Sequence, residues 1–156
     1  MDLDADELAG IVDLFGLLPR ADLRTAVREL AFRRDTEVTT DAVDSAIDDA
    51  VADFVLIQFA MDDETVLVPG PTAFPTMPEG AEDLPHILDA ERRTVDRSVL
   101  ATPIRNRLES AAASVSDPSE AADLLEVTYD AETWTDVALD DVRERLIRVA
   151  DTGGPG

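Results

Sequence analysis

The stretch DAVDSAIDDAVADFVLIQF, residues 41–59, decides the fold that this sequence predicts. Apolar side chains recur at steps of three or four residues from Val43 to Phe54, which is the period of a helix with one inner face. The apolar run FVLIQF that follows is typical of a strand. A helix that runs directly into a strand is the arrangement found in winged-helix DNA-binding proteins, so the stretch predicts a unit of that kind.

The same helix raises the question of whether the protein touches DNA, because it is strongly acidic. A recognition helix presents Arg, Lys, Asn or Gln to phosphates and base edges, and phosphate neutralisation dominates its affinity. Here the segment offers no basic residue and five aspartates: Asp41, Asp44, Asp48, Asp49 and Asp53. We therefore predict a solvated scaffold helix, through which nucleic acid is not bound.

Two further helices are predicted before this one. The first has one apolar face, begins near an aspartate cap and ends at Gly16, and the second runs from Pro19 to about Arg34. Thr40 is predicted to cap the third helix. The short segment GLLP leaves no room for the strand that winged-helix proteins place between their first two helices, and Glu37–Val38 is the only other candidate.

After the third helix, FVLIQF and TVLVPG are predicted as two strands joined by the five-residue connection AMDDE. The predicted class is α+β, mainly helical. The predicted organisation is a winged-helix-like unit of three helices and a β-hairpin at 1–70, a proline-rich connector packed on it at 71–101, a helical C-terminal part at 102–151 and a loose tail at 152–156. Whether the two halves share one core or form two domains stays open.

The composition indicates the solvent in which the protein works. The formal net charge is -22, from 35 acidic and 13 basic residues, and every basic residue is Arg. Periodic apolar patterns argue against disorder. In molar salt the Debye length falls to about 3 Å, so dense carboxylates repel each other little, whereas lysine stems would add apolar surface. This composition favours a protein of a halophile's cytoplasm.

The sequence shows no sign of a membrane or secretory segment. No run approaches the about 18 apolar residues of a membrane-spanning helix. The acidic start MDLDADEL lacks the basic residues that open a secretory signal. We therefore expect a cytoplasmic protein that does not insert into a membrane.

Several kinds of chemistry lack the residues they need. The chain has no cysteine for a thiolate, no lysine for a GxxxxGK phosphate loop, and neither GxSxG nor GxGxxG. Its one histidine, His86, lies in the apolar context LPHILD, where packing or a hydrogen bond within a loop is expected. We predict no catalytic residue, no cofactor site and no metal site, and hence a protein that is not an enzyme.

Arginines gather in one stretch where the chain stops being acidic. The possible partner-binding residues are Arg92, Arg93, Arg97, Arg105 and Arg107, and Asp96 is the one acid among them. The alternative is that they pair with carboxylates of the same chain, for which the planar guanidinium is well suited. The stripe of Arg20, Arg24 and Arg28 on the second helix is expected to pair in this way with nearby acids, the third helix among them.

Three segments resemble a known family. DELAGIVDLFG at 6–16, FPTMPEGAEDLPHILD at 74–89 and LLEVTYD at 124–130 are similar to segments of a haloarchaeal family known only as a domain of unknown function. The resemblance covers most of the chain, and its proline-rich segment is the most specific part. It implies a haloarchaeal protein, and it assigns no catalytic or binding residue.

Three classes of function are therefore considered. We favour a non-catalytic interaction or regulatory adaptor that uses a winged-helix-like scaffold to bind a protein partner. The alternative is a DNA-binding transcriptional regulator that contacts DNA through the Arg92–Arg107 region. The second alternative is an enzyme that uses clustered carboxylates and a metal. The partner, the pathway and the oligomeric state are left open.

Overall fold

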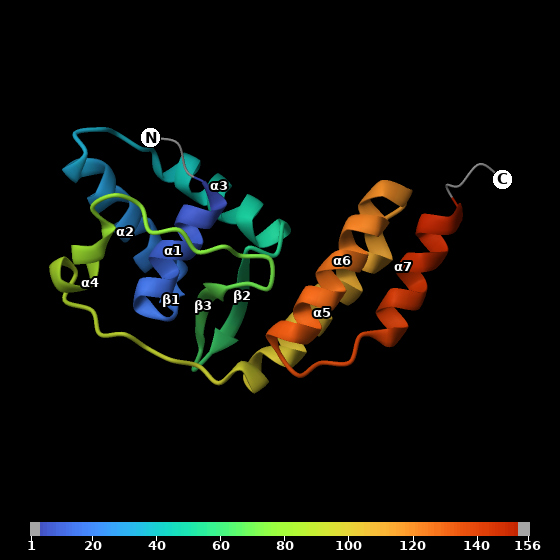
Figure 1. Cartoon of the computed structure of the whole chain (residues 1–156). Helices are drawn as coiled ribbons and strands as arrows, with labels where there is room; N and C mark the ends of the chain where they lie inside the picture. Colours follow the sequence, from blue (N-terminus) through green and yellow to red (C-terminus); the bar gives the residue numbers. More distant parts are fainter. Residues whose placement is uncertain (1–3, 153–156) are drawn as a thin grey trace. The chain divides into compact units, whose positions relative to one another are not determined.

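The computed structural model describes residues 4–152, and these fall into two compact units, one up to Val95 and the other from Asp96 (Figure 1). Residue 152 ends the last helix, and the rest of the predicted tail lies outside the described residues. The first unit comprises α1 (Ala5–Phe15), β1 (Leu18–Pro19), α2 (Arg20–Arg33), α3 (Thr40–Ala52), β2 (Leu56–Met61), β3 (Glu64–Pro69), the 3-10 turn η1 (Ala81–Asp83) and α4 (Leu84–Ile87). The second comprises the 3-10 turn η2 (Arg97–Leu100), α5 (Ala101–Ser114), α6 (Pro118–Trp134) and α7 (Asp140–Thr152).

The predicted class, α+β and mainly helical, is confirmed by this set of helices with one small antiparallel sheet. The strand order is β1-β3-β2, with Leu18 opposite Leu67 in one ladder and Leu56 opposite Pro69 in the other. The prediction that GLLP leaves no room for a strand was wrong, because a bridge of two residues is sufficient. Glu37–Val38, the alternative candidate, is not a strand.

The hairpin between β2 and β3 is tighter than predicted. The ladder continues to Met61 opposite Glu64, so the connection is the two residues Asp62 and Asp63 rather than five. Both have positive φ, 51° and 64°, as the type I′ turn of a two-residue hairpin requires. The prediction of a longer loop failed because Ala60 and Met61, read as loop residues, extend the pairing.

The ends of α3 set the path of the chain into the sheet. The N-cap is Thr39, whose hydroxyl accepts from the Ala42 amide at 3.1 Å, and not Thr40 as predicted. At the other end Phe54 is left-handed, with φ 64°, and the Val55 amide donates to the Ala50 carbonyl at 3.0 Å. This is a Schellman ending, which turns the chain from helix to strand without a loop.

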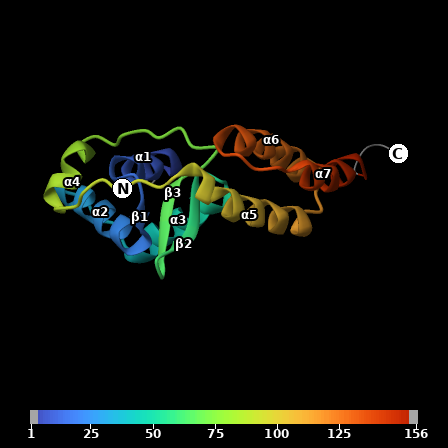
Figure 2. The same ribbon diagram turned by 90° about the horizontal axis from the view of Figure 1, so that it is seen from below.

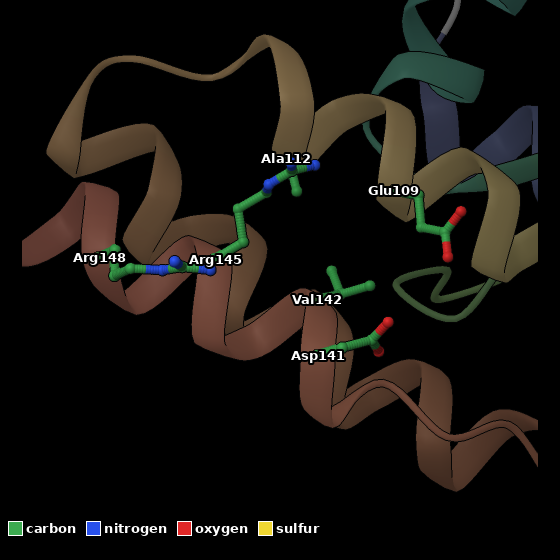
Figure 3. Close-up of a pocket in the computed structure, with 6 residues that line it drawn as sticks. All are labelled: Glu109, Ala112, Asp141, Val142, Arg145 and Arg148. Atoms are coloured by element: carbon green, nitrogen blue, oxygen red, sulfur yellow. The ribbon is translucent and has the colours of Figure 1, made fainter.

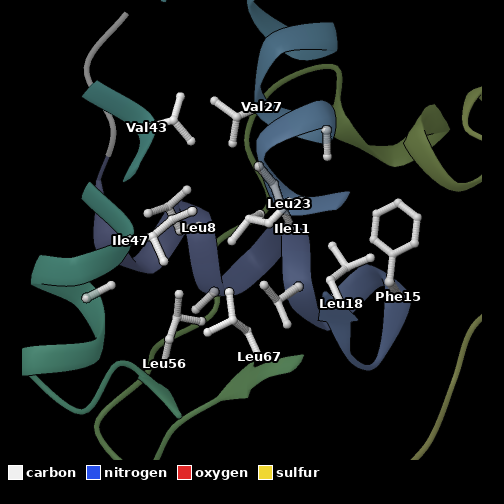
Figure 4. Close-up of a cluster of buried hydrophobic side chains, with 14 of the residues drawn as sticks. Leu8, Ile11, Phe15, Leu18, Leu23, Val27, Val43, Ile47, Leu56 and Leu67 are labelled. Atoms are coloured by element: carbon white, nitrogen blue, oxygen red, sulfur yellow. The ribbon is translucent and has the colours of Figure 1, made fainter. Parts of the chain in front are cut away.

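The core of the first unit is formed where α1 lies between the other helices and the sheet (Figure 4). Each element contributes fully or almost fully buried apolar side chains, because its apolar residues repeat with the period of that element. The labelled members are Leu8, Ile11, Phe15, Leu18, Leu23, Val27, Val43, Ile47, Leu56 and Leu67. Ala81 and Leu84, from the segment that follows the hairpin, belong to the same core.

The proline-rich segment is fastened to α1 by backbone contacts. The Thr76 amide donates to the Asp6 carbonyl at 3.0 Å near the start of α1, and the Arg93 amide donates to the Phe15 carbonyl at 2.8 Å at its end. A Cβ on Gly10 would lie 1.9 Å from the Thr76 carbonyl oxygen, so the approach requires glycine. The segment also contains α4, a short helix that the sequence did not predict.

The second unit packs α5, α6 and α7 together (Figure 2). Its buried apolar side chains are Leu100, Ile104, Leu108, Ala112, Ala121, Ala131, Leu139, Val142 and Leu146. Asp117 caps α6, since its carboxylate accepts from the Ser119 amide at 3.3 Å. Within residues 4–152, no helix combines the length and apolar character needed to cross a bilayer.

At Gly10 we expect the usual effect of a glycine-to-alanine substitution on stability to be reversed. A glycine in a helix interior is normally less stable than alanine by roughly 0.5–1 kcal/mol. Because an added Cβ would meet the Thr76 backbone, we expect Gly10→Ala to destabilise the protein by about 1–3 kcal/mol instead. Urea unfolding measures the change, and a variant at least as stable as the parent would show that the segment does not lie against α1.

Candidate interaction site

Arg92 and Arg93, two of the predicted partner-binding residues, belong to the first unit and contact its helix α1 and its strand β3. The Arg92 guanidinium donates to the carbonyls of Asp13 and Leu14, which are at the C-terminal end of α1. A cation there satisfies free carbonyls and interacts favourably with the helix dipole. Arg93 forms an ion pair with Glu64, at 3.4 Å from Nη1 to Oε2.

Arg97, Arg105 and Arg107, the other three, lie in the second unit. Arg97 Nη1 donates to the Trp134 carbonyl at 2.9 Å, and its guanidinium lies 5.1 Å from the centre of the Trp134 ring. Arg105 pairs with Asp141 at 2.5 Å and with Glu109 at 2.8 Å. Arg107 is half-buried on α5. The binding role of these arginines stays a prediction, while Arg92, Arg93, Arg97 and Arg105 make the contacts described here within their own unit.

The Arg105 contact shifts the pKa of both partners away from their usual values. Its hydrogen bond to Asp141 is the main reason why the pKa of that carboxyl is below its usual value, and it raises the pKa of the Arg105 guanidinium. The positive charge of Arg105 is therefore matched by two carboxylates of the same unit, Glu109 and Asp141.

Arg20 and Arg24 of the stripe on α2 pair with α3, as predicted, whereas the predicted pairing of Arg28 with an acid was wrong among the residues that the structure describes. Arg20 Nη2 lies 2.5 Å from Asp48 Oδ1, and its Nη1 donates to Gln58 of β2 at 3.2 Å. Arg24 Nε lies 3.3 Å from Asp44, without the geometry of a hydrogen bond. Part of the acidic face of α3 is thus already occupied by arginines of the same unit.

The sequence also raised His86 and clustered carboxylates as residues that a metal site would need. His86, for which packing or a hydrogen bond within a loop was expected, is exposed on the short helix α4, so the packing is not found. In the described part of the chain, no group of three or more His, Asp or Glu side chains is arranged to hold a metal ion.

An exposed aromatic residue beside a hollow marks the C-terminal end of α2. Phe32 is 78% exposed, although its neighbour Ala31 is buried in the core. The hollow has a volume of about 320 Å³ and is lined by Arg28, Ala31, Phe32, Thr36, Glu37, Val38 and Thr39. We call this surface the Phe32 hollow. Val38 is half-buried there, so the floor is partly apolar.

Two arginines near the Phe32 hollow have charges that the fold does not use. Arg28 lines the hollow. Arg33 lines a second, larger depression of about 750 Å³, whose lining also includes three acidic residues. The residues that line this depression are Glu7, Leu30, Arg33, Arg34, Glu79, Gly80 and Asp83. Among the residues that the structure describes, neither Arg28 nor Arg33 has an ion-pair partner. This end of α2 therefore combines an exposed ring with available cations, in a chain that is otherwise strongly acidic.

A further hollow of about 320 Å³ lies in the second unit and is lined by residues of α5 and α7 (Figure 3). Its lining residues are Glu109, Ala112, Asp141, Val142, Arg145 and Arg148. Arg145 and Arg148 lie toward one end of the hollow, and the carboxylates of Glu109 and Asp141 lie toward the other. We call it the α5–α7 hollow.

Sequence reasoning missed Phe32, Arg145 and Arg148. A signal for Phe32 was available in the sequence, because the apolar residues Leu23, Val27, Leu30 and Ala31 recur with the helical period and Phe32 falls outside that stripe. No comparable signal marks Arg145 and Arg148, because their surroundings depend on how α5 packs against α7.

Comparison with known proteins gives a family. The model of a family of unknown function, DUF7109, matches residues 6–151, so the chain belongs to that family. No curated protein and no solved structure matches the chain.

The Arg143–Glu132 pair predicts how the second unit responds to acid. Arg143 lies 2.6 Å from Glu132 Oε1, and this hydrogen bond is the main reason why the pKa of Glu132 is below its usual value. The stability from this lowered pKa is present above the unfolded pKa of about 4.3 and is lost as the pH falls through the folded pKa. Melting temperatures measured between neutral pH and strong acid should therefore depend less on pH in Glu132→Gln than in the parent.

Glu126→Gln is the matched control, because Glu126 is an exposed glutamate of the same helix. If Glu132→Gln and the parent lost stability equally on the acid side, the pair would have no role in stabilising the second unit.

Proposed function

We propose that this member of the DUF7109 family is a non-catalytic interaction or regulatory adaptor of a salt-rich cytoplasm, and that it binds a protein partner through the Phe32 hollow. The observation that carries the proposal is the position of Phe32, an exposed ring beside a partly apolar hollow. Aromatic side chains that fill pockets are typical anchors of protein interfaces.

A salt-rich solvent gives an energetic reason for a partner to cover the Phe32 ring. Burying a phenylalanine side chain is worth about 1.5–3 kcal/mol relative to leaving it exposed, and salts that are excluded from protein surfaces strengthen that preference. Phe, Trp and Tyr together make up 4% of the chain. Phe32 (78% exposed) and Phe74 (77%) are equally exposed, so the fraction alone does not single out Phe32; its position beside the hollow does, because a partner that fills the hollow would also cover the ring.

The first unit supports a winged-helix-like scaffold for this role. Its order of helix, strand, two helices and two strands, with the sheet order β1-β3-β2, is that of winged-helix proteins. In that comparison α3 takes the place of the recognition helix. Its carboxylates oppose contact with phosphates, and Arg20 and Arg24 already neutralise part of the face. These features favour a protein partner over duplex DNA.

The charge distribution supports a halophilic, haloarchaeal setting. The chain carries 35 acidic residues, has no lysine, and uses arginine for its ion pairs. At low salt the excess charge of -22 would repel itself over a Debye length of about 30 Å at 0.01 M.

Partner capture tests the Phe32 hollow directly. The parent protein, immobilised in molar KCl, should retain a defined set of proteins from cells of its source, and Phe32→Ser should lose that set because the anchoring ring is gone. Phe74→Ser is the matched control, since Phe74 is 77% exposed but lies outside the hollow. Retention of the same proteins by Phe32→Ser would remove the basis of the proposal.

Salt dependence tests the proposed setting. We expect cooperative folding in molar KCl and a loss of helix content and melting temperature on dialysis to about 0.01 M salt, because screening of the acidic surface is lost. Circular dichroism in the two buffers measures both quantities. Equal helix content and equal melting temperature would contradict the halophilic assignment.

A further inference from the structure

The sheet of the first unit has two edges that differ in how they are protected. A free edge presents unpaired N–H and C=O groups to other chains, and proteins normally protect it by a short strand, proline, a bulge or charged side chains. One edge is β1, which is two residues long and ends with Pro19. The other is β2, Leu56–Met61, which pairs only with β3 in this sheet. The β1 edge thus has two of these protections.

The β2 edge has none of them. Its six residues, LIQFAM, include neither proline nor a charged residue, although 31% of the chain is charged. The register with β3 runs without a break from Leu56 opposite Pro69 to Met61 opposite Glu64, so the strand has no bulge. A chain rich in charge therefore leaves uncharged the strand at which charge would prevent pairing with another chain.

Alternation along the antiparallel ladder identifies the outward backbone groups of β2. Met61, which precedes the two-residue turn, belongs to a hydrogen-bonded pair. Hydrogen-bonded and non-hydrogen-bonded pairs alternate, so Leu56, Gln58 and Ala60 point their N–H and C=O groups away from β3. Pro69 opposite Leu56 agrees with this assignment, because proline has no N–H to donate.

Two of these three residues are accessible. Gln58 and Ala60 are exposed, whereas Leu56 is buried. Arg20 binds Oε1 of the Gln58 side chain, which leaves the Gln58 backbone available. Within residues 4–152, the outward N–H and C=O groups of Gln58 and Ala60 have no hydrogen-bond partner. Two donors and two acceptors therefore face outward, on residues that are about 6.8 Å apart along the strand.

We propose that the outer edge of β2 binds an extended segment of a protein partner, which joins the sheet as a fourth strand. An extended backbone is the ligand that matches alternating donors and acceptors at this spacing. The segment is uncharged where it lies along Gln58 and Ala60, because a charged side chain there would meet no opposite charge on β2. No β2 residue lines the Phe32 hollow, so this inference does not depend on the partner proposed there.

A second copy of this chain is a less suitable occupant. Pairing β2 with β2 would bring together two chains of net charge -22, and the outward groups of Gln58 and Ala60 would be the backbone contacts that hold them. An uncharged segment of another protein meets the same groups without that repulsion.

Peptide selection with the full chain tests the proposal. A phage library of random peptides is panned on the immobilised parent protein in molar KCl, and the most enriched peptide is synthesised. Its dissociation constant should rise about tenfold or more in Ala60→Pro, which removes an outward N–H and leaves the bonds to β3 in place. Ala60→Ser, which keeps the N–H, and Phe32→Ser, which alters the hollow, should bind the peptide as the parent does.

The period of the contact provides a second measurement that needs no variant. Single N-methyl groups on the peptide should abolish binding at alternate residues only, because every second N–H of an added strand faces β2. The bound peptide should also slow hydrogen exchange at the amides of Gln58 and Ala60.

Three results would overturn the proposal: no enriched peptide, equal binding by a folded Ala60→Pro variant, or N-methyl effects without a period of two. Equal binding by Ala60→Pro together with loss in Phe32→Ser would place the peptide in the Phe32 hollow, which overturns this inference and leaves the proposed function standing. Self-association of the parent that is lost in Ala60→Pro, measured by sedimentation equilibrium, would assign the edge to a second copy instead.

Discussion

The constraint on which the rest of the structure depends is the shortage of positive charge. Thirteen arginines must serve a chain with 35 acidic residues. Arg20 illustrates the consequence, since one guanidinium reaches Asp44 and Asp48 of α3 and Gln58 of β2. An exposed ion pair contributes only about 0.2–1 kcal/mol. Its main effect here is therefore to orient α3 and to reduce the repulsion along its face.

The same use of arginine recurs through both units. Arg92 caps the C-terminal end of α1, while Arg105 and Arg143 link helices of the second unit. Cations held in this way are less available to a polyanion. Among the residues that the structure describes, Arg28 lines the Phe32 hollow and Arg145 and Arg148 line the α5–α7 hollow, and these three form no ion pair.

Much of the fold could be predicted from periodicity, and the parts that failed depend on contacts between distant residues. The apolar spacing from Val43 to Phe54 predicts α3 and the strand after it, because both periods are local properties. The strand at Leu18–Pro19 escaped prediction, since its two residues become a strand only by pairing with β3. The short hairpin escaped because nothing local distinguishes Ala60 and Met61 from a loop.

The candidate sites divide in the same way, into features that the local sequence shows and features that depend on contacts between distant residues. The pairing of Arg20 and Arg24 with α3 followed from counting charges, whereas the individual contacts of Arg92 and Arg97 are with backbone carbonyls, which sequence patterns do not reveal. Phe32 was detectable as an aromatic residue outside an apolar stripe. The α5–α7 hollow was not, because it is lined by side chains of two helices separated in sequence by α6.

Duplex DNA binding tests the central claim most directly, which is that the arginines serve the fold and that α3 is a scaffold. Fluorescence anisotropy with labelled duplex should be measured at the lowest salt at which the fold survives, because even a true DNA-binding protein weakens steeply as salt rises. We predict no saturable binding by the parent protein. Saturable binding that is lost when Arg92, Arg93, Arg97, Arg105 and Arg107 are all changed to Gln, in a variant that remains folded, would contradict the account.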